Sequence, residues 1–151
     1  MRIAVGADHA GWELKPAIVG WLKEKGIPHR DLSPHPPDPQ DDYPDVAVAV
    51  ARSVASGDSD LGIAICGTGV GSCIVANKVA GVRAALCTDT VCARCSRSHN
   101  DANVLCLGGR ILGVALALGI VEAWLDTPFS GAPRHRRRLE KVARLESEGN
   151  R

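Results

Sequence analysis

Short apolar runs alternate with longer amphipathic stretches along this chain, and this alternation limits the folds open to it more than any other feature. Such alternation is typical of repeated βα units arranged around a parallel sheet. The clearest run is Leu61–Cys66, which has no charged side chain and passes directly into a glycine-rich loop. We therefore expect an α/β protein with strands at 2–7, 29–32, 61–66, 82–87 and 104–107, and helices at 11–25, 45–56, 72–79, 90–98, 111–125 and 137–148.

Length and charge narrow the class of protein further. The 151 residues predict one domain over 1–151, ending in the 137–148 helix, with a core large enough to fold unaided. The formal net charge is +1, so the molecule as a whole does not attract nucleic acid or an anionic membrane. No segment approaches the roughly 20 apolar residues needed to span a bilayer. Met1 leads straight into the first strand without a signal segment, and we expect a cytoplasmic protein.

The six cysteines raise the question of disulfides or a metal site. Most lie inside apolar runs, where free thiols behave as small hydrophobic groups and the cytosol keeps them reduced. Cys92 and Cys95 form a C-x-x-C pair, but a zinc ribbon needs a second such pair and the chain has none. The spacing also suits adjacent turns of a helix. We favour structural cysteines over a zinc or redox site.

A glycine-rich loop at 66–71 carries the first chemical signal. Its three glycines let the backbone approach a ligand closely, and the helix that follows offers N–H groups to negative charge. Such a loop suits a phosphate, a dinucleotide or an oxyanion formed during a reaction. A tight structural turn explains the same pattern about as well.

Cys66, at the start of this loop, adds information. A thiol beside backbone N–H groups and a helix N-terminus is expected to have a lowered pKa, which makes it a usable base or nucleophile. A cysteine phosphatase would need an arginine where this chain has Ser72. A dinucleotide site would need its glycine pattern after the first strand, where Ala7-Asp8-His9 stands instead.

Further polar residues follow the ends of predicted strands. Asp8 and His9 suit proton shuttling or hydroxyl binding, although Asp8 could equally cap the next helix. The run 98–103 includes His99 and Asn100, which slightly favours ligand contact over a simple polar turn. Tyr43, the only tyrosine, follows a proline-rich loop that we expect to form a pocket wall. Arginines suited to phosphate, or to a solvated helix face, are Arg110, Arg134 and Arg138.

Together these pieces resemble the type B ribose-5-phosphate isomerase family, which also includes galactose-6-phosphate isomerase subunits. The resemblance extends from Ile3 to about Val142 and depends on seven motifs in a fixed order. The motifs are Asp8-His9-Ala10-Gly11, Asp42-Tyr43-Pro44, Cys66-Gly67-Thr68-Gly69-Val70-Gly71, Ala76-Asn77-Lys78, Ser98-His99-Asn100-Asp101-Ala102-Asn103-Val104, Gly108-Gly109-Arg110 and Arg134-His135.

The resemblance implies a Rossmann-like α/β/α sandwich, catalysis without a metal or organic cofactor, and a homodimer, sometimes a tetramer, with active sites between subunits. Its substrate is a small phosphorylated sugar. By this resemblance Asp8 and His99 help to open the furanose ring, and Cys66 moves a proton between C2 and C1 through an enediolate. The other implied roles are stabilisation of negative charge by Thr68 and the backbone of Gly67, Gly69, Val70 and Gly71, phosphate binding by His9, Arg110, Arg134 and Arg138, and contacts to sugar hydroxyls by Tyr43 and Asn100.

Some members of that family use a glutamate base at the position of Ser72, so this chain resembles the cysteine-base type. Two departures bear on the substrate. The segment 33–40 is unusually rich in proline and borders Tyr43, and the tail carries the extra arginines Arg136 and Arg137. We expect a pentose 5-phosphate isomerase. The same chemistry on a tetrose or hexose phosphate, or a phosphate- or nucleotide-binding module without turnover, stays open.

Overall fold

Strands and helices alternate along the computed structural model, which describes residues 1–35 and 38–149. The strands are β1 (Ile3–Ala7), β2 (His29–Asp31), β3 (Leu61–Cys66), β4 (Ala84–Leu86) and β5 (Val104–Gly108). The helices are α1 (Lys15–Glu24), α2 (Tyr43–Ala55), α3 (Val70–Ala76), α4 (Thr90–Asn100), α5 (Val114–Leu125) and α6 (Pro133–Gly149). The predicted α/β class and all five predicted strands are confirmed.

The five strands form one parallel sheet in the order β2-β1-β3-β5-β4. The central strand β3 is buried along its whole length because both of its faces are covered. Its register places Ile63 beside Val5 on one side and beside Leu105 on the other. β2 lies at one edge, as its weak apolar pattern predicts.

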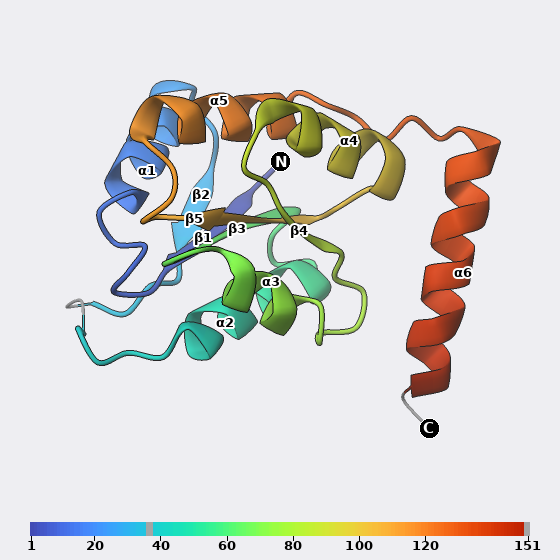
Figure 1. Ribbon diagram of the computed structural model, residues 1–151, viewed down its shortest axis with the longest axis horizontal. Helices are drawn as coiled ribbons and strands as arrows, with labels where there is room; N and C mark the ends of the chain where they lie inside the picture. Colours follow the sequence, from blue (N-terminus) through green and yellow to red (C-terminus); the bar gives the residue numbers. More distant parts are fainter. Residues whose placement is uncertain (36–37, 150–151) are drawn as a thin grey trace.

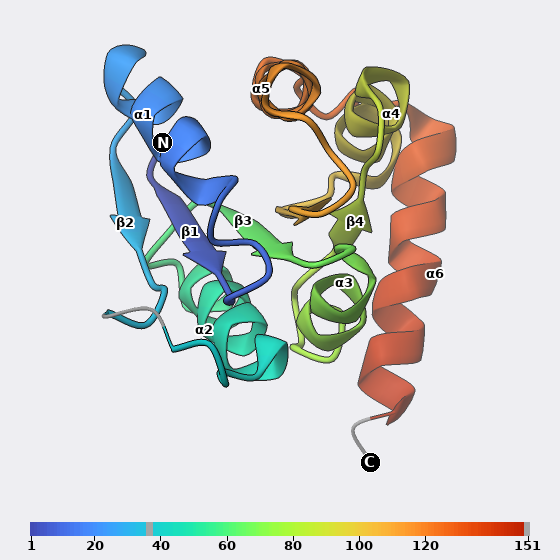
Figure 2. The same ribbon diagram turned by 60° about the vertical axis from the view of Figure 1, so that its left-hand side comes forward.

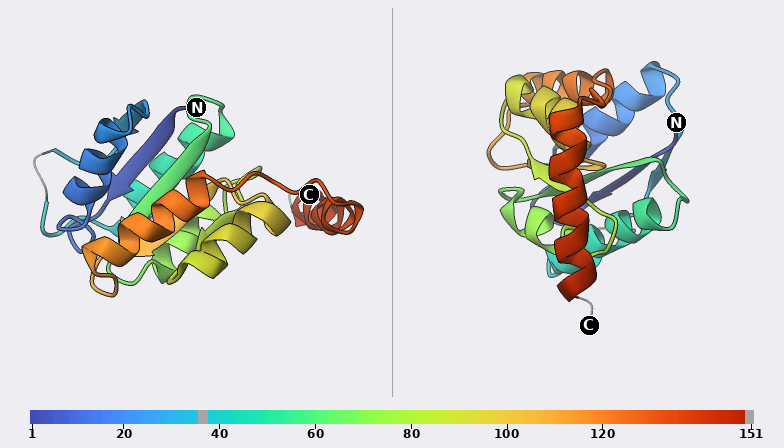
Figure 3. Two further views of the ribbon diagram at one scale, coloured as in Figure 1. Left: turned by 90° about the horizontal axis from the view of Figure 1, so that it is seen from above. Right: turned by 90° about the vertical axis from the view of Figure 1, so that its right-hand side faces the viewer.

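Helices cover both faces of the sheet and produce the expected Rossmann-like sandwich. Figure 1 shows α1, α4 and α5 on one face and α2 and α3 on the other. The first face buries Ile18, Ile120 and Trp124 in one apolar cluster, and the second buries Val50 in another. The α6 helix stands beyond the β4 edge, on the far side of α4 from the centre of the sheet (Figures 1 and 3).

The chain reverses its direction of winding between β1 and β3. After β1 it enters α1 on one face, whereas after β3 it enters α3 on the other, and the two strand ends lie side by side (Figure 2). The loops that follow these two strands therefore lead to helices on opposite faces of the sheet. In open parallel sheets, ligands bind at the carboxyl ends of the strands where the winding reverses in this way.

Several helices begin at other residues than predicted. α1 begins at Lys15 instead of position 11, because turns such as Gly11 N–H to the Asp8 carbonyl occupy the segment before it. α3 begins two residues early, at Val70. α6 begins at Pro133 instead of 137, with the proline in the first turn, where its missing N–H is tolerated. Of the proline-rich segment, Pro36 and Pro37 lie outside the described residues.

None of the helices that the structure describes is both long enough and apolar enough to cross a membrane.

Candidate active site

The loop after β3 and the loop after β5 are joined by backbone hydrogen bonds. The Gly109 N–H donates to the Cys66 carbonyl at 2.8 Å, and the Arg110 N–H donates to the Gly67 carbonyl at 3.0 Å. The aliphatic part of the Arg110 side chain passes beside Gly67, where an added Cβ would lie 3.7 Å from Arg110 Cδ. The sheet ladder thus continues past the strand ends and holds the arginine beside the cysteine loop.

The loop after β1 packs against the same strand ends. The Asp8 N–H donates to the Ile65 carbonyl at 3.2 Å, and a Cβ on Gly11 would come within 2.6 Å of that carbonyl oxygen. Asp8 is buried, and its Oδ1 accepts the Gly11 N–H at 2.8 Å. Asp8 therefore closes the turn before α1 but does not cap that helix, whose N-cap is Leu14 without a side-chain cap. No hydrogen-bond partner of the second carboxylate oxygen of Asp8 is found among the described residues.

Cys66 is the last residue of β3 and its side chain is 4% exposed. The Gly69 N–H donates to Cys66 Sγ at 3.2 Å. This requires Gly69 to adopt a left-handed conformation, with φ of +81°, which a residue with a side chain would adopt only at a cost. The loop therefore turns back over the sulfur and presents a backbone N–H to it.

Two neighbouring side chains border this loop. The Val70 N–H lies 3.4 Å from Thr68 Oγ1, which places the threonine hydroxyl at the start of α3. The Tyr43 ring lies against Gly71, where an added Cβ would come within 2.7 Å of Tyr43 Cε2. Glycine at position 71 is thus needed for the close approach of the tyrosine, which starts α2.

His9 has a partner that the sequence did not reveal. Its backbone N–H donates to Asp41 Oδ1 at 3.0 Å, and its ring Nδ1 lies 2.7 Å from the same oxygen. The hydrogen bond to Asp41, opposed by partial burial and assisted by the nearby charge of Asp8, raises the pKa of His9 above its usual value. His9 is thereby favoured as a cation.

The predicted residues His99 and Asn100 lie elsewhere. They end α4, which starts near the carboxyl end of β4 and runs back along the sheet. The Arg83 Nε, one residue before β4, donates to the Asn100 carbonyl at 3.0 Å. The end of α4 therefore lies at the amino ends of the strands, opposite Cys66.

His99 instead meets the start of α6. The rings of His99 and His135 have centroids 4.4 Å apart. Arg134 Nε donates to His135 Nε2 at 3.2 Å, which leaves Nδ1 of His135 to donate to Ser130 Oγ at 2.7 Å. Burial lowers the pKa of His135, and the positive charges of His99, Arg134 and Arg138 lower it further. His135 is therefore neutral and holds Arg134 in place.

The structure thus divides the predicted site residues into two groups at opposite ends of the sheet. One, which we call the cradle, comprises Asp8, His9, Tyr43, Cys66, Gly67, Thr68, Gly69, Val70, Gly71 and Arg110. The other, which we call the His99 cluster, comprises His99, Asn100, Arg134, His135 and Arg138.

The remaining cysteines form no bridge among the residues that the structure describes. Cys92 and Cys95 both lie in α4, on adjacent turns, as the helical interpretation of their spacing predicts. Within residues 1–35 and 38–149, no three His, Cys, Asp or Glu side chains lie close enough together to hold a metal ion.

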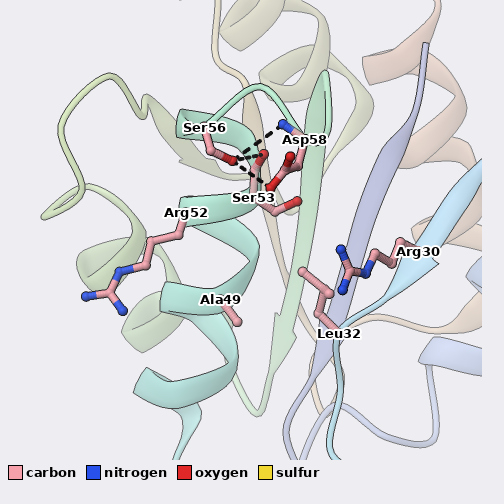
Figure 4. A pocket seen from close by; sticks show the side chains of 7 residues that line it. All are labelled: Arg30, Leu32, Ala49, Arg52, Ser53, Ser56 and Asp58. Atoms are coloured by element: carbon pink, nitrogen blue, oxygen red, sulfur yellow. Dashed lines mark hydrogen bonds between the residues drawn. The ribbon is translucent and has the colours of Figure 1, made fainter.

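A separate hollow of about 390 Å³ lies between β2 and the end of α2 (Figure 4). Its two arginines, Arg30 and Arg52, extend in different directions in that view. The Ser56 hydroxyl donates to the Ser53 carbonyl at 3.3 Å and contacts Asp58 at 3.0 Å, so these groups close the helix end. No predicted site residue lines this hollow, and the candidate active site is the cradle.

Comparisons with known proteins identify the family of the chain. The family model described as Ribose/Galactose Isomerase matches residues 3–142. Ribose-5-phosphate isomerase B of Escherichia coli is 46% identical over 149 residues, 99% of each chain. D-erythrulose-4-phosphate isomerase of Pectobacterium atrosepticum is 44% identical over 151 residues, covering 98% of this chain and 97% of its own.

Solved structures show the same likeness. The structure of Clostridium thermocellum ribose-5-phosphate isomerase B superposes with a TM-score of 0.94 at 48% identity, covering 98% of this chain and 99% of the other. That of the Mycoplasma genitalium enzyme with bound ribulose-5-phosphate has a TM-score of 0.92 at 46% identity, covering 97% of each chain. The chain therefore belongs to the ribose/galactose isomerase family.

Proposed function

We propose that the protein interconverts ribose 5-phosphate and ribulose 5-phosphate, with Cys66 as the proton-transferring base. The observation that carries this proposal is the position of the Cys66 sulfur. It lies at the carboxyl end of β3, where it accepts the Gly69 N–H, and the loops that carry Asp8 and Arg110 are hydrogen-bonded to the same strand end. Relatives named ribose-5-phosphate isomerase B, one with ribulose-5-phosphate bound, support the choice of substrate.

The proposed reaction begins with opening of the furanose ring, in which Asp8 and His99 move the proton between the ring oxygen and the hydroxyl at C1. The Cys66 thiolate then removes the proton from C2, and the electron pair of that C–H bond forms the C1–C2 double bond of an enediolate. At the same time the electrons of the C1 carbonyl move onto its oxygen. The same sulfur returns the proton to C1, while the proton of the C2 hydroxyl passes to the oxygen at C1, so that C2 becomes the carbonyl of the ketose and C1 carries a hydroxyl.

Backbone groups of the glycine loop stabilise the negative charge that forms on the enediolate. The N-cap of α3, Gly69, has no side chain to cap the helix, and among the described residues no partner is found for the Gly71 N–H of the first turn. The Val70 N–H donates to Thr68 Oγ1 at 3.4 Å. Donors that are already held in place cost no reorganisation when charge develops. The Thr68 hydroxyl adds a donor at the same point.

The phosphate and the second proton-transferring group require a second subunit. Ring opening needs His99 near Asp8, yet one chain holds them at opposite ends of its sheet. A homodimer resolves this if the His99 cluster of one subunit reaches the cradle of the other. His9 and Arg110 would then bind the phosphate together with Arg134 and Arg138 from the partner chain.

A second substrate is favoured by one comparison. The relative from Pectobacterium atrosepticum is named D-erythrulose-4-phosphate isomerase and is 44% identical to this chain. The catalytic residues determine the type of reaction more firmly than they determine the length of the sugar, because proton transfer involves only C1 and C2. A tetrose phosphate therefore ranks second, and a hexose phosphate third.

The first test is turnover of ribose 5-phosphate by the purified protein with a chelator present throughout. Rapid formation of ribulose 5-phosphate is the expected result, and it would also exclude a need for loosely bound metal. Turnover only with erythrulose 4-phosphate or a hexose phosphate would keep the chemistry and correct the substrate. No turnover of any of these sugars would favour a binding module without catalysis.

A further inference from the structure

The contact between His9 and Asp41 joins two segments that are far apart in sequence. His9 follows β1, whereas Asp41 ends the proline-rich segment just before α2. One carboxylate oxygen, Asp41 Oδ1, accepts both the backbone N–H of His9 at 3.0 Å and its ring Nδ1 at 2.7 Å. Two bonds to one atom set both the position of the residue and the rotation of its ring.

Asp41 is itself held firmly. Its N–H donates to the Asp38 carbonyl at 3.1 Å, and the carboxylate of Asp38 accepts the Gln40 N–H at 2.9 Å. The Asp41 side chain is 12% exposed, compared with 39% for His9. The carboxylate is therefore sheltered by its surroundings, while part of the imidazole stays open to a ligand.

The protonation of the ring follows from this arrangement. An ionised carboxylate only accepts hydrogen bonds, so the proton on Nδ1 must point at Asp41. A neutral ring would then offer a lone pair at Nε2, which repels a phosphate, whereas an imidazolium offers a second N–H. Among the described residues, no hydrogen-bond partner is found for Nε2.

The charges that act on the His9 ring all favour the cation. They are Asp41, from the segment before α2, and Asp8, from the loop that also carries His9. A sugar phosphate carries close to two negative charges at neutral pH, because its second pKa is about 6. A charge-assisted hydrogen bond between an imidazolium and such a dianion is about twice as strong as a neutral one.

We propose that Asp41 is a positioning residue, which holds His9 as an imidazolium with its Nε2–H directed to the phosphate of the substrate. The proposal rests on the proposed function for the identity of that substrate. It also gives the proline-rich segment a specific role, because this segment ends in the carboxylate that orients the phosphate-binding ring.

The test compares Asp41→Asn with Asp45→Asn. Asparagine at position 41 keeps a carbonyl oxygen for both hydrogen bonds but removes the charge. Asp41 and Asp45 both line a hollow between the loop after β2 and the start of α2. Asp45 is exposed and makes no hydrogen bond to His9 among the described residues, so its substitution is a matched control for the loss of one charge. For both variants, kcat and KM for ribose 5-phosphate are measured between pH 6.5 and pH 9.

Asp41→Asn is expected to raise KM about tenfold, the effect of weakening one hydrogen bond to a charged group, and to leave kcat within about twofold. Because the carboxylate raises the pKa of His9, its loss should move the fall of 1/KM with rising pH to lower pH. Asp45→Asn should match the wild type. An unchanged pH profile in Asp41→Asn, or equal loss of kcat and kcat/KM, would overturn the proposal.

A second measurement keeps the proposal testable if the variant folds poorly or the substrate is wrong. The ring signals of His9 are titrated by NMR in the wild-type protein, with and without inorganic phosphate. Titration above the usual range of histidine, with a further rise on adding phosphate, is expected. Titration at or below that range would overturn the role of Asp41 even in an active enzyme, whereas failed turnover with the expected titration would overturn only the proposed substrate.

Discussion

The cradle and the His99 cluster are held together in different ways. The cradle is built from loops that continue the sheet ladder, so backbone bonds such as Gly109 N–H to the Cys66 carbonyl set its geometry. The His99 cluster depends on side chains between two helices, with the buried His135 linking Ser130 to Arg134. Backbone bonds to neighbouring strands therefore set the first, whereas side-chain contacts set the second, which lies beyond the β4 edge of the sheet.

The proposed reaction draws on both groups. The cradle holds Cys66 and Asp8 for proton transfer and His9 and Arg110 for the phosphate, and the His99 cluster adds His99 and two arginines. Because one chain holds the two groups at opposite ends of its sheet, the proposed site combines the cradle of one subunit with the His99 cluster of another. Substitutions in either group should therefore stop turnover, and mixing experiments can show whether the two groups come from different chains.

The largest effect is expected from the cradle. Cys66→Ser should lower kcat by about 10³-fold, because the serine hydroxyl is not ionised near neutral pH and cannot act as the base. KM should change little, since the sulfur does not bind the phosphate. Steady-state kinetics with ribose 5-phosphate measure both, with Cys73→Ser as a control of equal chemistry outside the cradle. A Cys66→Ser enzyme with near-full kcat would show that the base is another residue.

The next prediction tests whether the cradle and the His99 cluster of one active site come from different subunits. Cys66→Ser and His99→Asn should each be nearly inactive alone. In a heterodimer of the two, one site combines an intact cradle with an intact His99 cluster and the other combines both substitutions. After unfolding and refolding of an equal mixture, about a quarter of wild-type activity should return if subunits pair at random.

The matched control for this experiment is a mixture of Cys66→Ser with Asp8→Asn. Both substitutions lie in the cradle, so no pairing of these chains restores a complete site. Recovery in this mixture as well, or in neither mixture, would contradict a site shared between the cradle of one subunit and the His99 cluster of its partner.

Most of the cradle could be predicted from the sequence because all of its members except Tyr43 follow a strand closely. Once the strands are parallel, Asp8, Cys66 and Arg110 must meet at the same edge. The same rule places His99 at the other edge, since its polar run comes before the fifth strand. Asp41 could not be predicted: it lies 32 residues from His9, in a segment without periodicity, and only folding brings the two together.

A smaller effect is expected from chemical modification, because the cysteine thiols should differ in reactivity. Contact with the Cys106 thiol, opposed by partial burial and aided by Leu86 and Asn77, lowers the pKa of Cys73 to about 6. At pH 7 Cys73 should therefore react with iodoacetamide before the buried Cys66 does. Mass spectrometry at short times should find the label on Cys73 while turnover is still unaffected. First labelling at Cys66, with matching loss of activity, would reverse this order.

The smallest effect on turnover is expected from a substitution of Asp31, the last residue of β2. Asp31 accepts the Ser33 N–H, and Ser33 Oγ in turn accepts the Ala7 N–H at the end of β1. Asp31 also pairs at 2.7 Å with Lys15, whose side chain is 5% exposed and whose ammonium lies over the Trp12 ring. Burial would raise the pKa of Asp31, but the bonds from Lys15 and Ser33 outweigh it and lower the pKa to about 2.

Asp31→Asn should reduce the free energy of unfolding by about 2 kcal/mol at pH 7, because it leaves the Lys15 charge buried without its partner. The value lies below that for a fully buried pair, since Asp31 keeps 26% of its side chain exposed. A carboxyl with a depressed pKa stabilises the fold above its unfolded value near 4, so the deficit should shrink as the pH falls toward 2. Urea unfolding at several pH values measures this, with the exposed Glu13→Gln as control. A deficit that stays constant down to pH 2 would mean that the carboxylate charge is not its source.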